Sequence, residues 1–116
     1  MKRQSTSEKG DRYDTLMPLL EAMFREFQDL TKKKPDGVLS KRKVEVVNRL
    51  LKDVIGVLEG ESSRTYLDML DEADLPQNSD VVLILGQFVA AMKGFHSKYW
   101  KFSHAAGTHR WMIEDE

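Results

Sequence analysis

The chain has 116 residues, of which 41% are hydrophobic and 32% are charged, and its formal net charge is -1. These values are typical of one soluble globular domain with its own core, and they exclude a disordered or membrane-embedded chain. The absence of cysteine excludes disulfides, thiolate metal sites and cysteine nucleophiles.

The first ten residues are polar, so we expect residues 1–10 to form a mobile tail ahead of a helical domain over residues 11–102. The tail lacks the apolar core of a signal peptide. The longest apolar stretch, Val81 to Met92, is too short to cross a bilayer. We therefore expect a cytoplasmic protein with no membrane partner.

A first helix is predicted to start between Asp11 and Thr15 and to end near Lys33. If Thr15 caps the helix, Pro18 lies in the first turn, where its missing N–H costs nothing; a start at Asp11 requires a kink. Pro35-Asp36-Gly37 then indicates a turn. Apolar residues three and four apart share one helix face, and here they are Tyr13, Leu16, Leu20, Met23, Phe27 and Leu30.

A second helix is predicted from its N-cap Ser40 to Glu59, with Gly60 in a left-handed C-terminal cap. The short turn before it favours an antiparallel hairpin with the first helix. Its apolar face has the same spacing and consists of Val44, Val47, Leu51, Val54 and Leu58.

A short third helix is predicted from Ser62 or Ser63 to Leu70, before an interruption at residues 75–79. A fourth helix then runs from about Asp80 to Phe102, capped by Asn78 or Ser79. Val81 to Leu85 alone also fits a buried strand, but the apolar pattern continues in helical register and favours a helix. The expected fold is all-α: a small bundle of about four helices built on an antiparallel helical hairpin.

Two features of the C-terminal half bear on assembly. Gly86, Ala90 and Gly94 recur every four residues, which allows close backbone approach within the monomer or at a dimer seam. The tail over residues 103–116 contains Trp111-Met112-Ile113, and we expect this apolar cluster to dock on the body or on another subunit. Because three wide apolar faces are hard to bury in so small a monomer, we predict a homodimer.

Several kinds of chemistry are absent from the sequence. It has no Gly-rich phosphate loop and no Gly-x-Ser-x-Gly turn, so nucleotide binding and serine catalysis by those devices are excluded. His96, His104 and His109 are eight and five residues apart, without carboxylates at metal-binding spacing. We therefore predict no catalytic residue, no metal and no cofactor. An acid–base enzyme would need a buried carboxylate among Asp68, Asp71, Glu72, Asp74 and Asp80.

The near-neutral net charge conceals two opposed patches. Residues 32–43 form a basic turn with six cations against Asp36 alone; the cations are Lys32, Lys33, Lys34, Lys41, Arg42 and Lys43. Residues 59–80 form an acidic stretch in which seven carboxylates face only Arg64. The basic turn is a candidate phosphate-contacting site, a solubilising turn, or the partner of another copy's acidic stretch.

Aromatic and basic residues alternate at the end of the fourth helix. Phe95 and Tyr99 belong to its apolar face, which leaves Trp100 and Phe102, together with Trp111, as candidate partner-binding residues. The sequence thus favours a non-catalytic helical protein–protein interaction module that acts as a homo-oligomer and could serve regulation. The alternatives are a small nucleic-acid-binding protein that uses the basic turn, and an enzyme of unrecognised type.

Overall fold

The computed structural model describes the backbone of residues 2–113 and the side chains of residues 8–113. Met1 and residues 114–116, which belong to the two predicted tails, lie outside this part of the chain. The elements, in order, are α1 (Lys2–Lys33), α2 (Lys41–Leu58), the 3-10 helix η1 (Ser62–Tyr66), α3 (Asn78–Tyr99), β1 (Trp100–Ser103) and β2 (Thr108–Trp111).

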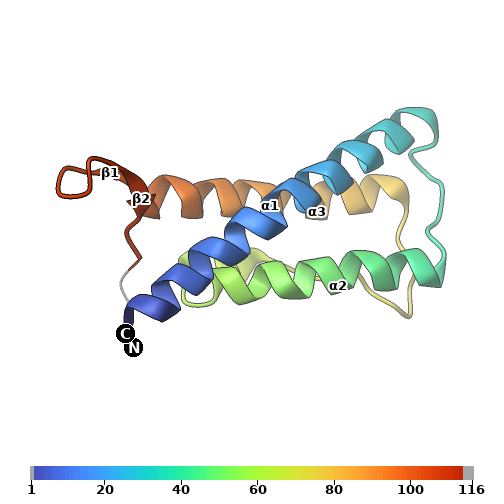
Figure 1. Cartoon of the computed structure of the whole chain (residues 1–116). Helices are drawn as coiled ribbons and strands as arrows, with labels where there is room; N and C mark the ends of the chain where they lie inside the picture. The colour runs from blue at the N-terminus through green and yellow to red at the C-terminus, as the bar shows by residue number, and fades with distance from the viewer. Residues whose placement is uncertain (1, 114–116) are drawn as a thin grey trace.

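The three long helices lie lengthwise in an elongated molecule of 51 × 25 × 21 Å (Figure 1). α2 runs antiparallel to α1, as the short turn between them predicts. α3 runs in the same direction as α2, so residues 59–77 must return along the length of the molecule before α3 begins. α1 makes its most extensive contact with α3 and a smaller one with α2.

The predicted apolar faces of all three helices meet in one core. Leu20 of α1, Leu51 of α2 and Leu85 of α3 are fully buried, and so are Phe88 and Met92. Val81 to Leu85 is helical: Val81 and Leu85, four residues apart, are fully buried, whereas Leu83, which a strand would place on the same face, is 65% exposed. The preference for a helix over a strand in this segment is therefore confirmed.

The prediction of about four helices is corrected by the segment that follows α2. η1 is a single short 3-10 helix, and the chain from Leu67 to Gln77 is irregular. The Asp71 carboxylate accepts hydrogen bonds from the backbone N–H groups of Ala73 and Asp74, at 2.8 and 3.2 Å. Such local bonds give the backbone an alternative to helix, and Pro76 disfavours a helix that runs through this segment into α3.

This irregular segment is fixed to α2 by one buried side chain. Asn48, which is 5% exposed, donates from Nδ2 to the carbonyl oxygen of Leu70 at 2.9 Å. Its Oδ1 accepts from the N–H of Leu70, also at 2.9 Å. The amide therefore satisfies both backbone groups of Leu70, whose own side chain is buried in the core.

The all-α prediction is corrected at the C-terminus. The fourth helix was expected to reach Phe102, but α3 ends at Tyr99 and residues 100–111 form an antiparallel β-hairpin. Trp100 pairs with Trp111 and Phe102 with His109, so aromatic rings share one face of the hairpin. Gly107, at φ +71°, supplies the left-handed residue of the connecting turn.

At the N-terminus, α1 begins at Lys2 rather than between Asp11 and Thr15, so residues 2–10 of the predicted tail are helical. Pro18 consequently lies inside the helix, where it removes the hydrogen bond to the carbonyl of Asp14. Both residues are exposed, so water can solvate this carbonyl. The early start brings Gly10 against the indole of Trp111, a contact that stabilises the first turns.

The helix ends follow the predicted capping in part. Ser40 caps α2 by accepting from the N–H of Lys43 at 3.2 Å, and Gly60 has φ +88°. α3 is capped by Gln77 rather than by Asn78 or Ser79, and the Asp80 carboxylate accepts from the N–H of Gln77 at 3.0 Å.

No helix within residues 2–113 is long and apolar enough to cross a membrane.

Candidate functional site

An open apolar groove runs between α1 and α2 on the side of the molecule away from α3. Its volume is about 530 Å³, compared with about 300 and 350 Å³ for two other hollows on the described surface. It extends from Leu16 to Leu30 along α1, which corresponds to about 21 Å at 1.5 Å per residue. The apolar lining residues are Leu16, Leu19, Ala22, Met23, Phe27, Leu30, Val46, Val47 and Leu50.

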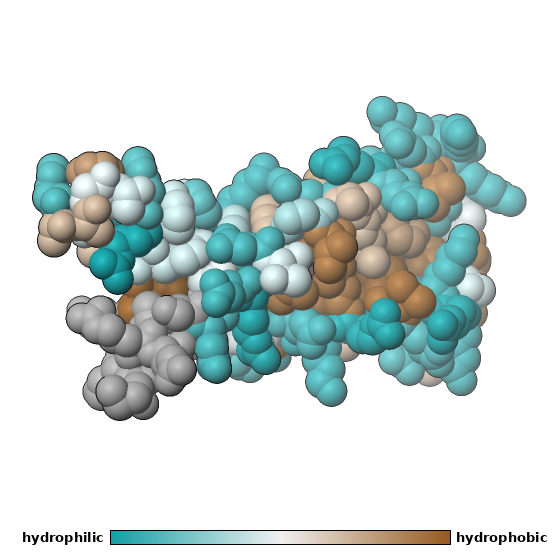
Figure 2. All heavy atoms as spheres, in the orientation of Figure 1, coloured by the Kyte–Doolittle hydropathy of each residue, from teal (hydrophilic) through white to brown (hydrophobic). Residues whose placement is uncertain are grey.

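Three large apolar side chains that line the groove are exposed to solvent. Leu19 is 54% exposed, Val46 39% and Leu30 36%. Figure 2 shows the corresponding hydrophobic surface between α1 and α2, toward the end of the molecule that holds the α1–α2 turn. A continuous apolar surface with a polar border is typical of a protein-binding site.

Charged residues of both signs border the groove. Glu26 lies on the α1 wall, and Lys43, Arg49 and Asp53 lie on the α2 wall. None of these four makes an ion pair among the residues whose side chains the structure describes. Their charges therefore remain available to a partner that covers the groove.

The groove was not predicted as a site, although the sequence contains a signal for it. Leu19, Val46 and Leu50 lie outside the apolar faces that were used to predict the hairpin, and they widen each face toward the same side. Because α1 packs mainly on α3, its contact with α2 leaves this added width uncovered.

The predicted dimer seam on α3 is mostly in solvent. A Cβ on Gly86 would make ordinary contact with the Phe24 ring of α1, at 3.6 Å, so this glycine faces the monomer's own α1. Ala90 and Gly94 are exposed, and a Cβ on Gly94 would have nothing within 4 Å. The three small residues therefore do not line a single close helix contact within the monomer.

The C-terminal hairpin folds back on the body of the same chain. The Trp111 ring lies 5.0 Å from that of Tyr13 in α1 and 5.6 Å from that of Phe95 in α3, measured between centroids. Its indole N–H points to the Asp14 carboxylate at 3.5 Å. Trp111 is thus half-buried among its own helices and offers only part of its surface to a partner.

The other two candidate partner-binding residues lie on β1. Trp100 is half-buried between the rings of His96 and His109, with centroids 5.8 and 6.2 Å away. Phe102 is 47% exposed and contacts His104 and His109 at the tip of the hairpin. The structure brings Trp100 and Trp111 together, and it leaves Phe102 as the most accessible of the three.

The basic turn lies at the end of the molecule where α1 stops and α2 starts. All six of its cations are exposed, and none takes part in an ion pair among the described side chains. Backbone hydrogen bonds from Asn78 to Gly37 (2.8 Å) and from Leu39 to Pro76 (2.9 Å) hold the end of the acidic stretch beside this turn. The C-terminal end of the acidic stretch therefore lies beside the basic turn, whereas Glu59 and Glu61 at its start lie at the other end of the molecule.

The acidic stretch has mainly structural contacts. Asp68, Asp71, Glu72, Asp74 and Asp80 are all exposed, so the buried carboxylate required by the acid–base hypothesis is not among them. Asp71 and Asp80 bind backbone N–H groups, as described above.

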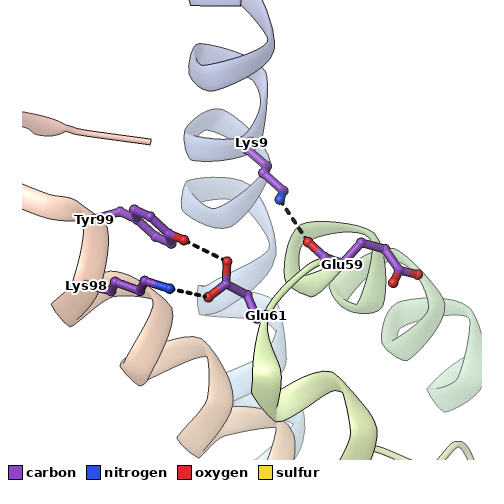
Figure 3. Close-up of polar contacts among 5 residues, drawn as sticks. All are labelled: Lys9, Glu59, Glu61, Lys98 and Tyr99. Atoms are coloured by element: carbon purple, nitrogen blue, oxygen red, sulfur yellow. Dashed lines mark hydrogen bonds and ion pairs between the residues drawn. The ribbon is translucent and has the colours of Figure 1, made fainter. Parts of the chain in front are cut away.

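A polar cluster at the opposite end of the molecule joins all three helices (Figure 3). The Glu61 side chain is 13% exposed and accepts from the Tyr99 hydroxyl at 2.8 Å and from Lys98 Nζ at 3.5 Å. Lys9 of α1 donates to the backbone carbonyl of Glu59, just past the end of α2, at 3.1 Å. The neighbouring Tyr99 hydroxyl, together with the Glu61 carboxylate, raises the pKa of the exposed Lys98.

Among the described residues, no group of three or more His, Asp or Glu side chains has a metal-binding arrangement. Comparisons of the chain with models of protein families, with curated proteins and with solved structures found no match. Conclusions about function therefore depend on the groove and the charged surfaces described above.

Proposed function

We propose that this protein is a non-catalytic helical protein–protein interaction module whose binding site is the α1–α2 groove. The observation that supports this best is the exposure of Leu19, Leu30 and Val46 around a hollow of about 530 Å³. A four-turn amphipathic helix would span the 14 residue steps from Leu16 to Leu30 and bury these side chains. The cytoplasmic location and the regulatory role stay predictions.

The groove can be tested with a photoreactive side chain at Val46 and, as a control, at Leu83. Leu83 lies on α3 outside the groove and is 65% exposed, so both positions tolerate a probe. In cells, the Val46 probe should give a defined protein adduct, either with a copy of this chain or with another protein, and the Leu83 probe should not. Equal labelling at both positions, or none at Val46, would contradict the proposal.

The basic turn supports a second candidate function, nucleic-acid binding, because its six cations are exposed and unpaired among the described side chains. Phosphate contacts weaken steeply as salt rises. Affinity for nonspecific DNA or RNA should fall linearly with salt on logarithmic axes, and replacing Lys32, Lys33 and Lys34 with Ala should abolish binding without unfolding the protein. Absence of salt-dependent binding would remove this candidate.

A further inference from the structure

The monomer exposes more surface than a compact chain of its size. Its accessible surface is 7699 Å² for 13.4 kDa. A compact monomer of this mass exposes about 6,500 Å². The radius of gyration, 16.0 Å, likewise exceeds the roughly 13 Å expected for this length. The excess of roughly 1,200 Å² follows from the elongated shape of the molecule, and a standard interface would cover about 800 Å² of each partner.

The structure favours the α1–α2 groove, rather than the predicted α3 seam or Trp111, as the surface for dimerisation. Trp111 is covered by Tyr13 and Phe95 of its own chain, and the apolar face of α3 is buried in the monomer's core. Other exposed apolar side chains, such as Leu83 of α3 and Phe102 of β1, lie outside the groove, whereas Leu19, Leu30 and Val46 of α1 and α2 gather around one hollow. An assembly that buries this surface leaves Ala90 and Gly94 in solvent.

The two walls of the groove are complementary to each other in charge. The α1 wall carries one charged lining residue, Glu26. On the α2 wall, Lys43 and Arg49 lie three residues before and three residues after Val46, so the two cations flank the exposed valine on one helix face. Asp53 lies farther along the same wall, which leaves the α2 wall with a net charge of +1. A surface with one negative wall and one net positive wall can bind its own copy when a twofold axis sets unlike walls against each other.

We propose that the occupant of the groove is a second copy of this chain, bound about a twofold axis that runs parallel to the groove. This axis places α1 of each copy on α2 of the other. The protruding Leu19, Leu30 and Val46 of one copy then enter the hollow of its partner, and Glu26 faces Lys43 and Arg49 across the interface. The inference rests on the proposed function, since it names the partner of the same groove.

The test uses charge reversal on each wall and sedimentation of the full chain at micromolar concentration. The wild type should sediment at twice its 13.4 kDa mass. Glu26→Lys alone and Arg49→Glu alone should each raise the dimer dissociation constant about 10- to 100-fold, because each symmetric dimer then has two like-charge contacts. An equimolar mixture of the two variants should restore the dimer, since Lys at 26 then faces Glu at 49.

A matched control is Asp29→Lys, which reverses a charge on an exposed α1 residue outside the groove lining and should leave the dimer unchanged. Far-UV circular dichroism of each variant should show unaltered helix content, since all three positions are exposed. A wild type that is monomeric at these concentrations would overturn the inference, and so would a mixture that fails to restore the dimer. A monomer whose Val46 probe labels a different protein would overturn the dimer while the proposed function stands.

Discussion

The hydrogen bonds between Asn48 and Leu70 lead to a quantitative prediction for stability. Replacing Asn48 with Leu keeps a side chain of similar size but removes both partners of the Leu70 backbone. Each lost bond removes about 1 kcal/mol, and a buried backbone group left without a partner costs about 1–3 kcal/mol unless it reaches water. Because residues 67–77 can shift partly into solvent, we expect a total loss of about 2–4 kcal/mol, a large share of the stability of a small domain.

Urea denaturation followed by circular dichroism measures this loss. The control is Asn78→Ala, which removes one exposed hydrogen bond to the carbonyl of Lys34 (2.9 Å) and should cost less than about 1 kcal/mol. Hydrogen exchange at the Leu70 amide gives a second readout, because the Leu variant should lose protection there first. A loss below about 1 kcal/mol for Asn48→Leu, with an unchanged m-value, would refute the assigned role of the two bonds.

A second substitution at this position adds a dependence on pH. Asn48→Asp keeps an acceptor for the N–H of Leu70 but sets a carboxylate against the Leu70 carbonyl and near Glu72, whose Oε2 lies 3.5 Å from Nδ2 of Asn48. The penalty should be largest at neutral pH and smaller below about pH 4, where a protonated Asp can donate to the carbonyl. A penalty that does not vary with pH would contradict this account.

Three further predictions concern the contacts around the two chain ends. Burial, with added repulsion from Glu21 and Asp14, raises the pKa of Tyr13 above its ordinary 10.0. The stability linked to this raised pKa is fully present below pH 10.0 and is lost as pH rises through the folded pKa. The urea midpoint of Tyr13→Phe should therefore fall less at alkaline pH than that of the wild type. Equal falls for the two proteins would contradict this. Glu61→Gln should cost about 1–2 kcal/mol in urea denaturation because the Tyr99 hydroxyl loses a charged acceptor. Glu59→Gln should cost little, since Glu59 accepts from Lys9 through its backbone and its side chain makes only an exposed ion pair with Arg64, at 3.8 Å. Similar losses for the two variants would contradict the assignment. A Cβ on Gly10 would overlap the Trp111 indole, so Gly10→Ala should displace this ring and red-shift tryptophan emission. As a control, Gly94→Ala places its Cβ in open space and should leave the emission spectrum unchanged. An unshifted spectrum for Gly10→Ala would refute the packing of Gly10 against Trp111.

The apolar spacing predicted the three long helices because each helix must bury one face, and that requirement acts locally along the chain. Capping at Ser40 and the left-handed Gly60 were predictable for the same reason, since both depend on a few neighbouring residues. The antiparallel arrangement of α1 and α2 followed from the short turn.

The features that sequence reasoning missed depend on contacts distant in the chain. Gly10 indicates a tail when read alone, and its helical state depends on Trp111, about one hundred residues later. Trp100 to Ser103 fits either a helix end or a strand, and pairing with residues 108–111 decides between them. The groove exists because α1 packs more extensively on α3 than on α2. The spacing of apolar residues along one helix does not specify how much of that helix contacts each neighbour.

The contact of Gly10 with Trp111 also has a consequence for folding and local opening. It closes a loop of nearly the whole chain, so its entropic cost is met only after the three helices have assembled. The first turns of α1 and the C-terminal hairpin should therefore form late and open together as one cooperative unit, below the free energy of global unfolding. Native-state hydrogen exchange should find the amides of residues 8–14 and 100–111 sharing one opening energy, lower than that of the α2 and α3 core.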